Sequence, residues 1–86
     1  MMKHREIVTL QVRRIVADVY GWSVAGTDET RALNYFRPGG RVAMTLRLAE
    51  EIGVAVPELT WHDLTDVGRL VAFVHQQIAS EYAAAD

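Results

Sequence analysis

The sequence has no cysteine and little proline, and long apolar runs are missing as well. None of its 86 residues is cysteine and two are proline. A chain without cysteine forms neither disulfides nor thiolate metal sites, so we expect a reducing compartment, the cytoplasm. No apolar run approaches the roughly eighteen residues of a membrane span. None follows the charged N-terminus at the length of a signal peptide either, and we therefore predict no membrane association.

Positively charged residues are slightly fewer than negatively charged ones, and they are unevenly distributed along the chain. The net charge of −2 at pH 7 argues against a dedicated nucleic-acid-binding protein, which usually carries strong positive charge. Between Glu29 and Glu50, however, the chain has no acidic residue and four arginines, which are Arg31, Arg37, Arg41 and Arg47. The central segment is therefore basic within an acidic chain.

Groups that perform catalysis are scarce. The chain has three histidines, and its two serines are Ser23 and Ser80. His62 stands beside Asp63, but no third residue follows at the spacing of a catalytic triad or a metal site. We therefore predict no metal, no catalytic residue and no enzymatic activity for the chain alone.

Helical periodicity is what the sequence does have. Apolar residues at helical spacing predict an amphipathic helix over 6–20 and a closing helix that begins after a Thr65 cap. The two stripes are Val8, Val12, Ile15, Val16 and Val19, then Val67, Leu70, Val71, Val74 and Ile78. A second helix is expected from Gly40 or Arg41 to about Ile52, with Gly53 as its stop. Thr60-x-x-Asp63 is typical of a capping box and predicts a very short helix over 61–64.

These elements predict an all-α fold. Residues 21–34 have the composition of turns, so a long loop is expected between the first two helices. We predict a four-helix bundle of three main helices and one short one, forming a single domain over 1–86. Its core would cover about 6–80, and the tail 81–86 would be flexible because it has no apolar stripe to bury.

Several segments together resemble the acyl and peptidyl carrier proteins. They are V-R-R-I-V-A-D-V-Y-G-W over 12–22, Y-F-R-P-G-G over 35–40, V-A-M-T-L-R-L-A-E-E-I-G-V-A-V-P over 42–57 and L-T-D-V over 64–67. The resemblance covers residues 8 to 78 and has no gap from 42 to 74. It implies the four-helix bundle of that family, named here a carrier-protein-like bundle.

The chain departs from the family where the family carries its prosthetic group. In carrier proteins a serine after the glycine turn is esterified to 4'-phosphopantetheine. Counting back from Pro57 places that serine at Pro38, whereas counting forward from Gly39 and Gly40 places it at Val42 and implies the loss of four residues. Neither position has a hydroxyl group, which a transferase would need as nucleophile. We therefore interpret the turn formed by Pro38, Gly39, Gly40 and Val42 as a degenerate attachment site without a cofactor.

A second departure concerns charge. The second helix of carrier proteins is acidic and docks on basic surfaces, whereas here it carries Arg41 and Arg47. Charge complementarity governs partner choice, so we expect a biosynthetic enzyme or synthase domain with an acidic docking surface. The resemblance implies a noncovalent interaction or adaptor module of a polyketide, nonribosomal peptide or fatty-acid-type pathway. The expected partner-binding residues are Trp22, Arg37, Arg41, Met44, Thr45 and Arg47.

Two other hypotheses stay open at this point. The chain could be a carrier that loads its cargo elsewhere, at Ser23 or at the C-terminal carboxylate of Asp86. It could also be a small anion- or nucleotide-binding module, because free N–H groups at a helix start and nearby guanidinium groups bind phosphate or carboxylate. Arg37 and Arg41, on either side of the glycine turn, would form that site.

Overall fold

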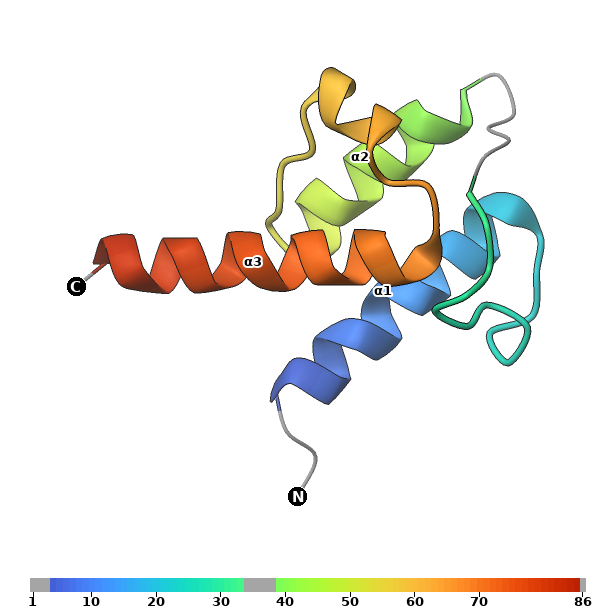
Figure 1. The fold of residues 1–86 in the computed structure, drawn as a ribbon, viewed down its shortest axis with the longest axis horizontal. Helices are drawn as coiled ribbons and strands as arrows, with labels where there is room; N and C mark the ends of the chain where they lie inside the picture. The colour runs from blue at the N-terminus through green and yellow to red at the C-terminus, as the bar shows by residue number, and fades with distance from the viewer. Residues whose placement is uncertain (1–3, 34–38, 86) are drawn as a thin grey trace.

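The structure, a computed structural model, describes the backbone of residues 4–33 and 39–85 and the side chains of residues 5–33 and 39–80. Within these ranges it contains three α-helices and one 3-10 helix, and no strand beyond an isolated bridge. The Cα radius of gyration is 12.5 Å, close to the roughly 12 Å expected of a compact domain of this length. Figure 1 shows α3 crossing α1, with α2 and the 3-10 helix packed on the same side of this pair. The all-α prediction is confirmed.

The first helix, α1 (His4–Tyr20), forms where the valine-rich stripe predicts it. Val8, Val12, Ile15 and Val16 are buried, as helical spacing requires of one apolar face. The helix ends at Gly21, whose φ of +73° is the left-handed conformation that lets the chain turn away. The N–H of Trp22 then donates to the carbonyl of Ala17, which closes the last turn.

The second helix, α2 (Gly40–Glu51), also keeps its predicted limits. Its inner face buries Met44 and Leu48 completely. Gly53 has a φ of +80°, and its N–H donates to the carbonyls of Leu48 and Ala49. The glycine stop is therefore confirmed, because a residue with a Cβ rarely adopts this conformation.

The short helix differs from its prediction. It is a 3-10 helix, η1 (Glu58–His62), that starts directly after Pro57 and has no side-chain cap. The N–H of Thr60 donates to the carbonyl of Pro57, so Thr60 lies inside the helix and the capping-box prediction is wrong. The tighter i to i+3 winding starts at the proline carbonyl and brings Trp61 into the core.

The closing helix, α3 (Val67–Ala85), buries the predicted stripe from Val67 to Val74. Its cap is not Thr65, because the Oδ1 of Asp66 accepts the N–H of Arg69 at 2.7 Å. An aspartate satisfies a free N–H at a helix start as well as a threonine does. The helical backbone continues past Ser80 to Ala85, and the flexibility of the tail remains a prediction.

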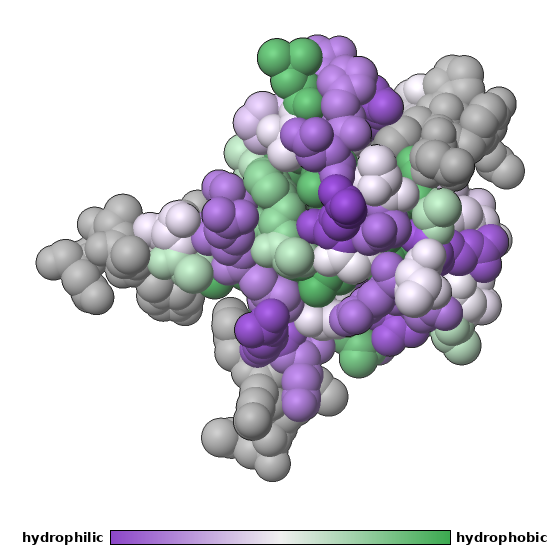
Figure 2. All heavy atoms as spheres, in the orientation of Figure 1, coloured by the Kyte–Doolittle hydropathy of each residue, from purple (hydrophilic) through white to green (hydrophobic). Residues whose placement is uncertain are grey.

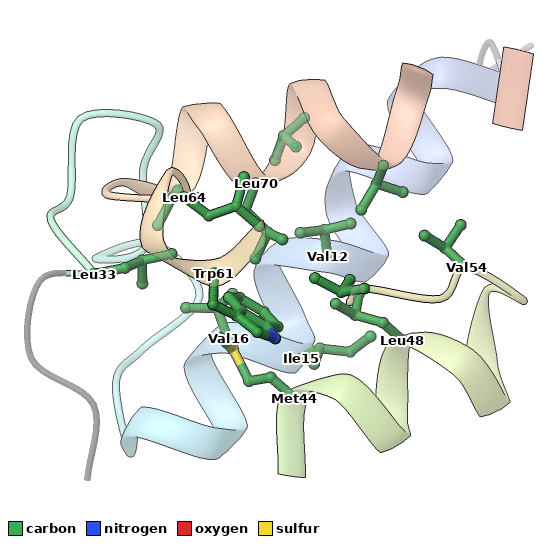
Figure 3. Packing of buried hydrophobic residues seen from close by; sticks show 14 of the residues in the cluster. Val12, Ile15, Val16, Leu33, Met44, Leu48, Val54, Trp61, Leu64 and Leu70 are labelled. Atoms are coloured by element: carbon green, nitrogen blue, oxygen red, sulfur yellow. The ribbon is translucent and has the colours of Figure 1, made fainter. Parts of the chain in front are cut away.

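A single hydrophobic core joins all four elements. Figure 3 shows the Trp61 ring of η1 beside Met44 of α2 and facing Ile15 and Val16 of α1. Its indole N–H donates to the hydroxyl of Thr45 at 2.9 Å, which satisfies its only polar atom. Trp61 therefore anchors η1 between the other helices.

The first loop is bound to the helices at two places. The Arg13 guanidinium donates to the carbonyls of Thr27 and Val24, at 2.7 and 3.0 Å. Further along, the N–H groups of Val67 and Gly68, at the start of α3, donate to the carbonyls of Arg31 and Glu29. The loop thereby satisfies groups that a helix start leaves without partners.

Candidate functional site

The predicted attachment turn leads into the first turn of α2. Gly39 is the N-cap, with a φ of +82° and no side-chain cap, and its carbonyl accepts the N–H of Ala43. Val42, the serine position in the forward count, is 62% exposed. Pro38 and Arg37 lie outside the described residues. The structure thus presents an apolar side chain where forward counting places the hydroxyl of a carrier protein.

A groove lies between this end of α2 and η1. Its volume is about 290 Å³, and it is open to solvent. The lining residues are Arg41, Val42, Thr45, Leu46, Val56, Glu58 and Trp61. Apart from one charged group on each wall, the groove is apolar, which is usual for a binding pocket.

Three large apolar side chains stand out at the groove. Val42 and Leu46 lie one helical turn apart on α2, with Leu46 56% exposed, and Leu59 of η1 is 79% exposed. Figure 2 shows an apolar protrusion over η1 surrounded by polar atoms. We call the groove with Val42, Leu46 and Leu59 the α2–η1 face. Exposed apolar side chains at a hollow, as Val42 and Leu46 are here, are typical of interaction sites.

Of the three exposed apolar residues of this face, Leu46 and Leu59 were not among the predicted site residues. Leu46 lies about 200° around the helix from Met44 and Leu48, so the helical period could have placed it opposite the core. Leu59 has no such signal, because a single 3-10 turn has no sustained period.

Two of the four arginines, Arg47 and Arg31, have partners within the chain. The Nη1 of Arg47 lies 2.8 Å from Asp18, and its Nε lies 2.6 Å from Glu51. The hydrogen bonds to Glu51 and Asp18 raise the pKa of Arg47. This guanidinium is neutralised by the chain's own carboxylates and links α2 to α1.

Arg31 is likewise engaged within the chain. Its guanidinium lies 3.8 Å from the centre of the Trp22 ring and donates to the carbonyl of Gly26. Trp22 in turn stacks on Tyr20, with ring centres 4.4 Å apart. Burial raises the pKa of Tyr20 to about 12, although the nearby positive charge of Arg41 lowers it. Arg31 and Arg47 therefore both have partners within the chain. The anion-site hypothesis stays a prediction, because it places the site at Arg37 and Arg41 and Arg37 lies outside the described residues.

The predicted partner-binding set also needs one correction. Met44 is fully buried in the core, so it packs the fold and contributes nothing to a surface. Thr45 is partly accessible and accepts the indole N–H of Trp61. Of the set, Arg41 and Thr45 line the groove, whereas Trp22 and Arg47 do not.

Of the remaining candidates, Ser23 and His62 do not line the groove. The Ser23 hydroxyl accepts the N–H of Gly26 within the first loop, and Asp86 lies outside the described residues. His62 is exposed.

Over the described ranges, no three metal-binding side chains gather, and no helix is long and apolar enough to cross a bilayer. A contact between His75 Nε2 and Thr9 Oγ1, at 2.9 Å, joins α3 to α1 and was not predicted.

No protein-family model, curated protein or solved structure matches this chain. Its resemblance to carrier proteins therefore depends on its own residues alone.

Proposed function

We propose that this chain is a carrier-protein-like four-helix bundle that carries no phosphopantetheine and acts as a noncovalent interaction module. It would dock on an enzyme or synthase domain of a polyketide, nonribosomal peptide or fatty-acid-type pathway as an adaptor. In this role the chain performs no chemistry, and binding alone would be its activity.

The exposure of Val42 carries the proposal. A solvent-exposed valine in the first turn of a helix contributes little to folding, because its side chain gains little from burial. Together with Leu46 and Leu59 it keeps an apolar surface in contact with water. Such a surface is stabilised when a partner covers it.

The structure also narrows the expected partner. A broadly acidic docking surface, expected from Arg41 and Arg47 of the second helix, is no longer part of the proposal, because Arg47 is already paired. The groove has Arg41 on its α2 wall and Glu58 on its η1 wall. Between these two charged residues the lining is mainly apolar, so we propose a partner that inserts an apolar group into the groove.

The absence of a prosthetic group can be tested by intact mass. After incubation with coenzyme A and a promiscuous phosphopantetheinyl transferase, we expect no mass gain for the natural chain. The double variant Arg41→Asp, Val42→Ser restores the family's Asp-Ser pair in the first turn of α2, and we expect it to gain one prosthetic arm. Modification of the natural chain would refute the proposal. A folded double variant that stays unmodified would argue against the carrier likeness.

The docking role can be tested by capture from the native host. We expect a biosynthetic enzyme to copurify with the tagged natural chain and to be lost from Leu46→Glu, which places a charge on the α2–η1 face. Ile7→Glu is the matched control, since Ile7 is an exposed apolar residue of α1 and does not line the groove. Equal recovery with both variants would place the interaction elsewhere.

A further inference from the structure

We propose that His75 is a positioning residue, which holds α3 on α1 through a hydrogen bond of fixed direction. Its Nε2 atom carries a hydrogen and donates it to the hydroxyl of Thr9, and this hydroxyl donates in turn to the backbone carbonyl of Arg5. The inference does not depend on the proposed function, because it concerns a contact within the pure chain.

Three polar atoms connect α3 to the backbone of α1. The Nε2 of His75, on α3, is 2.9 Å from the Oγ1 of Thr9, on α1. The same Oγ1 is 2.9 Å from the carbonyl oxygen of Arg5, one helical turn earlier. Both distances are those of hydrogen bonds. His75 and Thr9 are half-buried and follow the core residues Val74 and Val8, so the contact lies at the edge of the core.

The backbone of α1 decides which part of the hydroxyl faces the ring. A threonine within a helix commonly donates its hydroxyl hydrogen to the carbonyl four residues earlier, as Thr9 does to Arg5. A carbonyl only accepts, and a hydroxyl has one hydrogen. The Thr9 oxygen therefore meets His75 as an acceptor.

An acceptor on Thr9 requires a donor on the ring. If Nε2 had no hydrogen, the hydroxyl would have to donate to the ring, and the oxygens of Thr9 and Arg5 would face each other at 2.9 Å with no hydrogen between them. With the hydrogen on Nε2, both contacts are satisfied, and each strengthens the other because linked hydrogen bonds polarise one another. The hydrogen-bond network thus assigns the tautomer of His75.

This tautomer has a chemical consequence for the ring. A ring nitrogen that carries a hydrogen is a donor, with no acceptor lone pair for a further proton or for a metal ion. While the contact persists, the Nε2 of His75 is therefore neither a base nor a metal ligand. Its role is to set where α3 lies on α1.

NMR spectroscopy of the nitrogen-15-labelled natural chain tests the tautomer. At about pH 8.5, where an ordinary histidine ring is neutral, we expect the Nε2 of His75 to show the chemical shift and one-bond coupling of a nitrogen with a hydrogen. Its Nδ1 should show the shift of a nitrogen without one. The Nε2 hydrogen should exchange with water about tenfold more slowly than that of the exposed His62, because it is hydrogen-bonded.

Two matched variants of Thr9 separate the hydrogen bond from packing. Thr9→Val keeps the shape of the side chain and removes the acceptor, so we expect exchange of the Nε2 hydrogen to become about tenfold faster. Thr9→Ser keeps the hydroxyl and should preserve slow exchange. The backbone amides of α3 next to His75 should exchange at least about twofold faster in Thr9→Val than in Thr9→Ser, since the same contact holds this helix.

Three results would overturn the proposal. One is a neutral His75 ring with its hydrogen on Nδ1 alone. Another is an Nε2 hydrogen that exchanges as fast as that of His62 in the natural chain. The third is equal exchange in Thr9→Val and Thr9→Ser, which would mean that the Thr9 hydroxyl does not receive the hydrogen bond. These measurements use the pure chain, so none of their outcomes bears on docking, which the capture experiment measures separately.

Discussion

Two sides of this molecule are built differently. On the side of α1, α3 and the first loop, the carbonyls of the loop accept hydrogen bonds from Arg13 of α1 and from the start of α3. On the α2–η1 face, by contrast, three large apolar side chains are exposed beside an open groove. The comparison indicates that the first side maintains the fold, whereas the second is available for binding.

The sharpest contrast lies within η1 itself. Trp61 is buried and anchors the helix, whereas Leu59, two residues earlier, is almost fully exposed. One short helix therefore serves both sides, with one side chain in the core and another in solvent. Substitutions that separate these roles test the comparison directly.

The largest effect is expected from Trp61→Ala. Removing a buried tryptophan leaves a cavity and the Thr45 hydroxyl without its donor, so we expect a loss of about 3–5 kcal/mol in the free energy of unfolding. Leu59→Ala should change it by less than about 0.5 kcal/mol, because the side chain is already in water. Urea unfolding at low protein concentration measures both. Similar losses for the two variants would contradict the division between the sides.

A smaller effect is expected from the clamp on the first loop. Arg13→Met keeps the aliphatic stem but removes the donors to Thr27 and Val24, and we expect a loss of about 1–2 kcal/mol. Arg14→Met, at the exposed neighbouring position, should cost less than about 0.5 kcal/mol. Thermal unfolding followed by circular dichroism compares them. An Arg13 variant as stable as the Arg14 variant would show that the clamp does not hold the loop.

The cap of α3 should contribute somewhat less to the free energy of unfolding than Arg13 does. Asp66→Ala removes the acceptor of the Arg69 N–H and should cost about 1 kcal/mol. Thr65→Ala should cost less, because Thr65 accepts the N–H of Leu33 through its backbone carbonyl, which alanine retains. Urea unfolding of the two variants decides between the predicted and the observed cap. A larger loss of stability for Thr65→Ala than for Asp66→Ala would support Thr65 as the cap, as the sequence predicts.

The sequence predicts the fold well where a stripe is long. The valines of α1 and the stripe of α3 each repeat over several turns, so burial has one helical solution. The glycine at the end of α2 is equally informative, since few other residues adopt its backbone conformation. The cap of α3 was assigned to the wrong residue, because neighbouring Thr and Asp residues are nearly equivalent as caps. The short helix was predicted, but its type and bounds were wrong, because one short turn has no period.

The candidate site was less accessible to prediction. Four arginines near one another in sequence suggested a cationic surface, yet Arg47 pairs with Asp18, which lies 29 residues away. Met44 was assigned to the surface although it alternates with Leu46, which faces outward. Pairing across the fold depends on packing, which local sequence patterns do not contain, whereas the helical period alone could have placed Met44 and Leu46 on opposite faces of α2.

The pH dependence of the free energy of unfolding tests the contribution of Tyr20, at the end of α1. Its pKa is about 12 in the folded chain, against the ordinary value of 10, chiefly because of burial. Between these two pH values the unfolded chain has lost the phenol proton and the folded chain has kept it, so stability should fall as pH rises. The ring is only half-buried, and solvent keeps the effect below that of the cap. Urea unfolding across this range should show the fall, and Tyr20→Phe should remove this contribution.

The smallest effect is expected from the ion pair that joins α2 to α1. Asp18 is largely exposed, so Asp18→Asn should cost no more than about 0.5 kcal/mol, and high salt should erase the difference from the natural chain. Glu50→Gln, which removes an exposed carboxylate from α2, is the control and should leave the free energy of unfolding unchanged. A loss above about 2 kcal/mol for Asp18→Asn would mean that charge, rather than the burial of Met44 and Leu48, holds α2 in place. The α2–η1 face would then owe its position to a surface contact that salt can open.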